Sequence, residues 1–127
     1  DCERLLVLRD PDGAVDDLLG SAIAGAEDLD GDGLPEILVG ARGDDQYFFE
    51  RAGSVLVFSG ADGSILFKLQ QPYAGNLALG GGAVAVLGDV TADGIPDIAA
   101  SSGNRGSAVY VFSGADGRFA FWFASVS

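Results

Sequence analysis

Hydrophobic residues occur along the chain in short runs, and turns rich in glycine and aspartate separate these runs. Each run has about the length of an ordinary strand, and several alternate with a two-residue period. None combines a 3.6-residue period with the capping residues that begin and end a helix. We therefore predict an all-β protein, with strands at residues 22–27, 36–41, 54–59, 64–69, 83–88, 97–101, 108–113 and 118–124.

The sequence repeats itself once, with a change of frame. A shift of 61 residues carries Asp28 onto Asp89 and Pro35 onto Pro96. Further along each repeat the shift is 54 residues, and it carries V-F-S-G-A-D-G at 57–63 onto the same letters at 111–117. The loop that follows the second predicted strand is therefore longer in the first repeat than in the second.

Four antiparallel strands in about 50–60 residues match the size of one β-propeller blade. Residues 1–10 align with the last predicted strand of the first repeat, since Leu5 falls on Leu66 and Leu8 on Leu69. We predict two four-stranded antiparallel propeller-type blades plus an N-terminal strand, forming an incomplete β-propeller or an open stack of blades. In this division, residues 1–10 are the outer strand of a preceding blade, 11–70 are the first repeat and 71–127 are the second.

Charge and composition disfavour several classes of function. The chain has 19 acidic and 7 basic residues, a formal net charge of −12, no histidine and one cysteine. Nucleic acids are bound by basic surfaces, so a nucleic-acid partner is disfavoured, whereas cation binding is favoured. The absence of histidine removes the commonest general base and the commonest transition-metal ligand. No run of about 18 apolar residues is present, so we expect no membrane-spanning helix.

The acidic residues are concentrated in two loops, of which the first is D-L-D-G-D-G-L-P-E at 28–36. Asp28, Asp30 and Asp32 hold positions 1, 3 and 5, and Leu34 at position 7 offers a backbone carbonyl. Glu36 at position 9 adds a further oxygen. Oxygen ligands of this kind suit Ca²⁺ rather than zinc or copper, and Mg²⁺ usually keeps several waters.

The second loop, D-V-T-A-D-G-I-P-D at 89–97, is in phase with the first. Its candidate ligands are Asp89, Thr91, Asp93, the carbonyl of Ile95, and Asp97. Because affinity follows the number of charged ligands, three carboxylates should bind Ca²⁺ more weakly than four. We therefore predict two Ca²⁺ sites, the second weaker.

An EF-hand begins in the same way but needs an acidic residue at position 12 and flanking helices. Position 12 is Val39 in the first loop and Ala100 in the second, and both lie in predicted strands. Each loop is therefore predicted to join two strands of a hairpin.

The segment L-G-S-A-I-A-G-A-E-D-L-D-G-D-G-L-P-E-I-L-V-G-A at 19–41 resembles the FG-GAP repeats of the integrin α-subunit β-propeller and of many bacterial secreted proteins. The family's FG element falls on Leu19 and Gly20, and its GAP element on residues 40–42. The second repeat departs, with Gly80-Gly81 and Ser101-Ser102-Gly103 at these places. The resemblance implies one Ca²⁺ per blade in the first hairpin, and work outside the cytoplasm in adhesion, carbohydrate binding or scaffolding.

Several aromatic residues are candidates for contacts. Trp122 is the first candidate for a partner contact, because its counterpart in the first repeat is Lys68. Tyr47 and Phe48, in the longer loop, are further candidates for a partner or a sugar. The alternating Phe119, Phe121 and Phe123 are predicted to share one buried strand face. The tripeptide Arg42-Gly43-Asp44 matches the integrin-recognition motif, but we assign it to the turn of the repeat.

The leading hypothesis is a non-enzymatic, Ca²⁺-binding extracellular module for adhesion or structure. Complete members of the family have about seven blades, and exposed edges on two blades invite pairing. The chain is thus either a segment of a larger adhesin or a subunit that assembles with other copies or blades into a ring or filament, in which residues 3–9 complete another sheet. The alternative hypothesis is a carbohydrate-binding, lectin-like module.

Overall fold

The computed structural model describes residues 5–44, 52–70, 78–102 and 108–124. A single turn of 3₁₀-helix, η1 (Val15–Asp17), precedes eight strands. The strands are β1 (Leu19–Gly25), β2 (Ile37–Ala41), β3 (Ser54–Phe58), β4 (Ile65–Leu69), β5 (Leu79–Val86), β6 (Ile98–Ser102), β7 (Ala108–Phe112) and β8 (Phe119–Ala124). In this part of the chain, no helix is long and apolar enough to cross a membrane.

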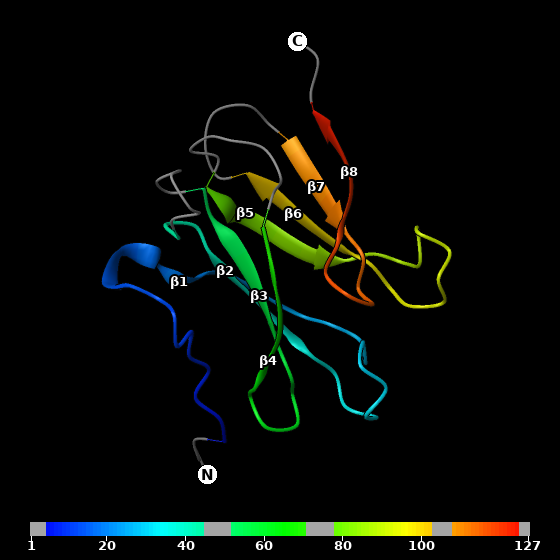
Figure 1. Cartoon of the computed structure of the whole chain (residues 1–127), viewed down its shortest axis with the longest axis horizontal. Coiled ribbons are helices and arrows are strands. Elements are labelled where there is room, and N and C mark those ends of the chain that lie inside the picture. Colours follow the sequence, from blue (N-terminus) through cyan, green and yellow to red (C-terminus); the bar gives the residue numbers. More distant parts are fainter. Residues whose placement is uncertain (1–4, 45–51, 71–77, 103–107, 125–127) are drawn as a thin grey trace.

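The strands form two four-stranded antiparallel sheets, in the orders β1-β2-β3-β4 and β5-β6-β7-β8 (Figure 1). Each sheet is one repeat, and its strands pair in the order in which they occur in the sequence. The all-β class, the two blades and the eight strands are therefore confirmed, with strand ends that differ from the prediction by a few residues.

Residues 5–10 are not part of a strand, although they were predicted to belong to one. A strand needs a hydrogen-bonded partner, and each blade already contains its four strands. The segment instead packs on the face of the first blade, where Leu8 contacts the cluster formed by Val39, Leu56 and Phe58.

The N-terminal segment nevertheless contacts the first blade in the same way as β4 contacts the second blade. A Cβ atom added at Gly63 would lie 3.2 Å from Leu8 Cδ2, and one at Gly117 would lie 3.1 Å from Leu69 Cδ2. Leu8 and Leu69 are equivalent in the repeat, as are Gly63 and Gly117. We propose on this basis that residues 1–10 correspond to the outer strand of a preceding blade.

The largest apolar core lies between the two blades. It combines one face of the first blade with the facing side of the second, and its fully buried members include Leu38, Val57, Leu79, Ile98 and Phe112. Strand β5 provides most of the contact, because it packs across β1 and β2 of the first blade. Burial of a large aliphatic side chain contributes about 1.5–3 kcal/mol, so the contact between the blades stabilises both of them.

The backbones of the two blades approach closely at Gly40 in β2. A Cβ atom at this position would lie 2.3 Å from the carbonyl oxygen of Gly80 in β5, a distance that side chains do not reach. The family's GAP glycine thus has a direct packing role in this chain. The pairing register places Gly40 opposite Val55, and the equivalent pair in the second blade is Ser101 opposite Val109.

An ion-pair group joins two segments of the first repeat to the N-terminal segment. Lys68 Nζ in β4 lies 2.6 Å from Asp44 Oδ2 and 3.4 Å from Asp10 Oδ2. Ser54 Oγ also donates a hydrogen bond to Asp44, over 2.7 Å. Partial burial by itself lowers the pKa of Lys68, but the hydrogen bond and charge of Asp44, together with Asp10, outweigh it and leave the pKa raised.

The prediction of one buried face for Phe119, Phe121 and Phe123 was wrong. The pairing of β7 with β8 shifts between Val111 and Phe112, so Phe119 packs edge-on against Phe112 with ring centroids 6.0 Å apart. Phe121 and Phe123 lie on the other face and are 43% and 56% exposed. Their equivalents in the first blade, Phe67 and Leu69, are covered by the second blade, whereas no described residue covers β8 in this way.

We predict that Gly40→Ala lowers the free energy of unfolding by about 3 kcal/mol, because the new methyl group forces the backbones of β2 and β5 apart. Urea denaturation measures this change. Gly25→Ala is the matched control, since a Cβ there meets nothing within 4 Å, and it should change stability by less than about 0.5 kcal/mol. Equal effects of the two substitutions would contradict the close approach of the blades.

A second prediction concerns alkaline pH. Because the folded pKa of Lys68 is raised, its stabilising contribution is complete below the unfolded value of about 10.4 and is lost as pH rises through the folded value. Lys68 is the only lysine in the chain, and Lys68→Arg keeps the charge at these pH values. The stability of the native protein should therefore fall relative to that of Lys68→Arg as the pH rises above about 10.4, as measured by urea denaturation; parallel curves would contradict this.

Candidate metal centres

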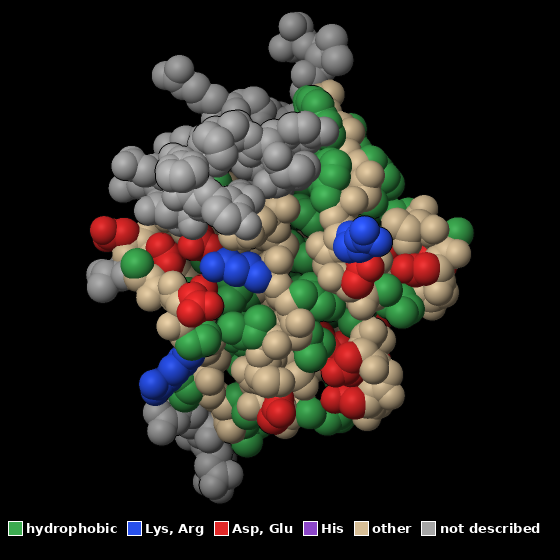
Figure 2. All heavy atoms as spheres, viewed as in Figure 1, with side chains coloured by type: hydrophobic (Ala, Val, Ile, Leu, Met, Phe, Trp, Pro, Cys, Tyr) green, Lys and Arg blue, Asp and Glu red, His purple; other side chains and the backbone are tan. Residues whose placement is uncertain are grey.

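Both acidic loops occupy the same place in their blades, between the first and second strands. The hydrogen bond from Ala26 N–H to the Glu36 carbonyl closes the first hairpin, and the bond from Leu87 N–H to the Asp97 carbonyl closes the second. Both loops project from the same side of the molecule (Figure 1). On the face drawn in Figure 2, acidic side chains lie on this side as well as on the opposite side, and basic side chains are few.

In the first loop, the aspartate side chains accept hydrogen bonds from backbone N–H groups of the same loop. Asp28 accepts hydrogen bonds from Gly31 N–H at 2.7 Å and from Gly33 N–H at 2.9 Å. Asp32 Oδ1 accepts one from Leu34 N–H at 2.8 Å. The hydrogen bond from Gly33, with those from other backbone groups, lowers the pKa of Asp28, so this carboxylate stays charged.

Glu36 is the most unusual member of the first loop, because its side chain is only 1% exposed. Its Oε2 accepts a hydrogen bond from Leu29 N–H, but its Oε1 is buried and has no hydrogen-bond partner. Burial, together with the charges of the neighbouring aspartates, raises the pKa of Glu36. A buried carboxylate oxygen without a partner is costly, so a cation bound at this position would stabilise the folded loop.

The geometry of the first loop fits Ca²⁺. One carboxylate oxygen from each of Asp28, Asp30, Asp32 and Glu36 lies within 4.8 Å of the others. Oxygens that share one Ca²⁺ ion lie about 2.3–2.6 Å from it, and therefore within about 5 Å of one another. The four acidic residues predicted from the sequence are thus brought together, and the buried Oε1 of Glu36 has no hydrogen-bond partner.

The second loop gathers Asp89, Asp93 and Asp97 within the same 4.8 Å, but here both oxygens of the last carboxylate have protein partners. Asp89 accepts hydrogen bonds from the N–H groups of Asp93 and Gly94, at 3.0 and 2.7 Å. Asp97 is fully buried, and its Oδ2 accepts bonds from Val90 and Thr91 N–H, each over 2.8 Å. In the second loop, backbone N–H groups therefore supply the hydrogen bonds that the buried carboxylate of Asp97 needs.

Two further donors reach the second loop from the turn between β7 and β8. Gly114 N–H donates to Asp97 Oδ1 at 3.1 Å, and Ser113 Oγ donates to Asp93 Oδ2 at 3.2 Å. Neither residue was identified from the sequence, because both lie about 20 residues beyond the loop. The only signal was the repeated S-G-A-D-G turn, which predicted a hairpin and no contact with an acidic loop.

The remaining candidates are only partly placed. Trp122 is 46% exposed and stacks on Tyr110, with ring centroids 6.2 Å apart. Tyr47 and Phe48 lie outside the described residues. The carbonyl roles assigned to Leu34 and Ile95 stay predictions; their N–H groups donate to Asp32 and Asp93, respectively.

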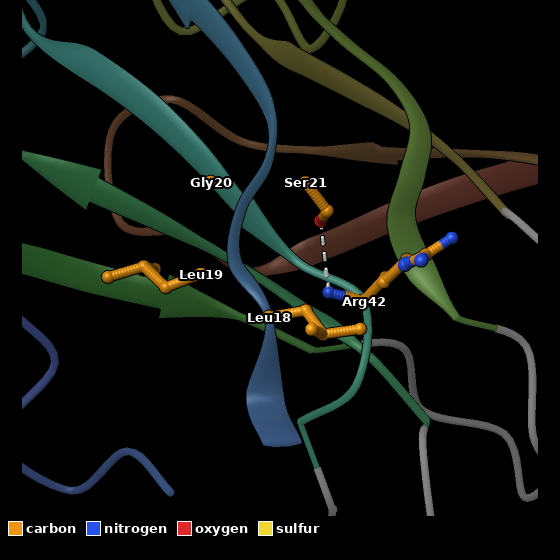
Figure 3. Close-up of a pocket in the computed structure, with 5 residues that line it drawn as sticks. All are labelled: Leu18, Leu19, Gly20, Ser21 and Arg42. Carbon is orange, nitrogen blue, oxygen red and sulfur yellow. Dashed lines mark hydrogen bonds between the residues drawn. The ribbon is translucent and has the colours of Figure 1, made fainter. Parts of the chain in front are cut away.

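A shallow hollow lies at the start of β1. It is lined by Leu18, Leu19, Gly20, Ser21 and Arg42, and Arg42 N–H donates to Ser21 Oγ at 3.1 Å (Figure 3). The guanidinium of Arg42 points away from Ser21, and it is the one charged group among the residues that line the hollow. Asp44, the acidic member of the Arg-Gly-Asp tripeptide, is buried and paired with Lys68, so this tripeptide is not presented as a recognition motif.

Comparisons with known proteins agree with the fold and the loops. The chain matches the FG-GAP-like repeat family over residues 28–100, a segment that contains both acidic loops. It is 34% identical over 101 residues to integrin alpha-4 of Xenopus laevis. That match covers 75% of this chain and 10% of the relative, so the chain spans about a tenth of the length of the curated relative it matches.

One backbone difference between the loops yields a prediction. Ala92 has a φ of 63°, whereas its equivalent in the first loop is Gly31. A left-handed backbone costs an L-residue about 1–2 kcal/mol, and the greater freedom of glycine in the unfolded chain offsets about 0.5–1 kcal/mol of this. We expect Ala92→Gly to raise the free energy of unfolding by about 0.5–1 kcal/mol in urea denaturation. Ala115→Gly, at an exposed residue without positive φ, should lower it, and a decrease in both variants would contradict the strain.

Proposed function

The chain belongs to the FG-GAP-like repeat family, and we propose that it is a Ca²⁺-stabilised, non-catalytic module of an extracellular protein that acts in adhesion or assembly. The observation that carries this proposal is the buried Glu36 with its unpartnered Oε1, beside three aspartates. An ion at this point would neutralise the acidic group and hold the first hairpin in its folded form.

The proposed first site consists of the carboxylates of Asp28, Asp30, Asp32 and Glu36 and the carbonyl of Leu34. The second loop, with Asp89, Thr91, Asp93, the carbonyl of Ile95, and Asp97, is the weaker candidate, and the proposed function does not depend on its binding an ion. Extracellular modules bind Ca²⁺ with dissociation constants of about 10⁻⁴–10⁻³ M, which suffices where the ion is abundant. The role of the ion is structural, since the acidic residues of the loops are accounted for as ligands or hydrogen-bond acceptors.

The outer face of the second blade is the surface through which we expect contact with a further blade or domain. Phe121 and Phe123 lie exposed on it, beside a shallow apolar groove that includes Ala99 and Val109. A neighbour cannot approach this face as β5 approaches the first blade, because Ser101 stands where Gly40 permits the contact. Assembly with another blade or another copy of the chain would therefore use a different offset between the sheets.

The test is the thermal stability of the full chain with and without Ca²⁺. If the dissociation constant is about 10⁻⁴–10⁻³ M, 10 mM CaCl₂ should stabilise the folded state by about 1.4–2.7 kcal/mol, or roughly 5–10 °C in Tm. Asp32→Asn should remove most of this gain, because the amide keeps the acceptor for Leu34 N–H but lowers the ligand charge. Differential scanning calorimetry in CaCl₂ and in EGTA measures both effects.

The controls separate specific binding from general charge screening. Asp16→Asn, in an exposed residue outside both loops, should keep the full response to Ca²⁺. A NaCl solution of equal ionic strength should give little of the stabilisation. If the native protein melts at the same temperature in 10 mM CaCl₂ and in EGTA, the proposed function is wrong.

A further inference from the structure

The two loops share a motif but differ in what compensates their last carboxylate. In the first loop, Glu36 has one backbone donor for one oxygen and none for the other. In the second loop, the equivalent Asp97 accepts four hydrogen bonds, from Val90 N–H, Thr91 N–H, Thr91 Oγ1 and Gly114 N–H. All four lie between 2.8 and 3.1 Å, so both oxygens of Asp97 are satisfied without an ion.

Asp97 is also one methylene shorter than Glu36, which keeps its carboxylate close to the hairpin backbone. Its Oδ1 meets the β7–β8 turn at Gly114, and Asp93 Oδ2 accepts a bond from Ser113 in the same turn. In the first blade the turn residue equivalent to Ser113 is Ser59. Both serines accept a hydrogen bond within their own turn, from Ala61 N–H or Ala115 N–H, and Ser113 in addition donates to the acidic loop of its blade. The β7–β8 turn thus cross-links the second loop as a shared cation would.

We propose that the β7–β8 turn replaces the cation in the second loop, so that this loop folds without an ion and stays empty at Ca²⁺ concentrations that saturate the first loop. The inference rests on the proposed Ca²⁺ site in the first loop, and it replaces charge count with hydrogen bonding as the reason for the weakness of the second. An ion entering the second loop would have to displace the bonds from Thr91, Ser113 and Gly114, which the first loop does not have to give up.

Position 5 of each loop offers a matched pair of variants, Asp32→Asn and Asp93→Asn. Asn at 93 can still accept from Ile95 N–H, and its amide can donate to Ser113 Oγ, so the hydrogen-bonded loop is preserved. Isothermal titration of the full chain with CaCl₂ should give one ion per chain in the native protein. Asp93→Asn should leave the stoichiometry and the dissociation constant within about twofold of the native values, whereas Asp32→Asn should weaken binding about tenfold or more.

The outcomes distinguish this inference from the proposed function. Two ions of comparable affinity per native chain, or a tenfold loss of affinity in Asp93→Asn, would overturn the inference and leave the proposed function standing. No binding at all in the native chain would overturn both. Binding of one ion that is lost in Asp93→Asn and kept in Asp32→Asn would place the ion in the wrong loop and would also overturn both.

Hydrogen exchange gives a second readout that does not depend on affinity. In EGTA, the amides of Val90, Thr91 and Gly114 should already be protected, because they donate to Asp97 in the ion-free loop. Addition of 10 mM CaCl₂ should slow exchange in residues 28–36 severalfold and leave residues 89–97 unchanged. Equal gains of protection in both loops would contradict the inference.

Discussion

A four-stranded blade has two apolar faces, and it cannot bury both of them without neighbours. In this chain, the second blade covers one face of the first, and the N-terminal segment covers part of the other through Leu8. The contact between blades is close enough that Gly40 meets the backbone carbonyl of Gly80 directly. The positions of the strands and the burial of the core depend on this packing, because β5 lies across β1 and β2.

The acidic loops show how one motif can be stabilised in two ways. Carboxylates held within 4.8 Å of one another repel, and the folded loop persists only if positive charge or donated hydrogen bonds offset the repulsion. In the first loop the donors come from the loop itself and leave Glu36 Oε1 without a partner. In the second, the turn between β7 and β8 adds two donors from outside the loop. A nearby turn and an ion are physically comparable solutions to the same electrostatic problem.

The second repeat differs from the first at residues that decide how a neighbour can pack on the outer face of the second blade. Blade packing in the first repeat requires a residue without a side chain at Gly40, and the second repeat has Ser101 there. Ser101 Oγ accepts a hydrogen bond from Ala83 N–H, so it serves its own sheet rather than a neighbour. The exposed Phe121 and Phe123 make the same face apolar. The second blade therefore presents a surface suited to burial but not to the packing geometry that the first blade uses.

The sequence by itself determined the strands, the two repeats and the acidic members of each loop, because strand periodicity, turn residues and ligand spacing are local properties. It also identified the FG-GAP resemblance, since that pattern is contiguous. Only the tertiary structure decided that Glu36 is buried with an unpartnered oxygen, that Ser113 and Gly114 reach the second loop, and that Phe121 and Phe123 are exposed. These features depend on the register between β7 and β8 and on which blade covers which face. Such relations join residues far apart in the chain, and no local pattern records them.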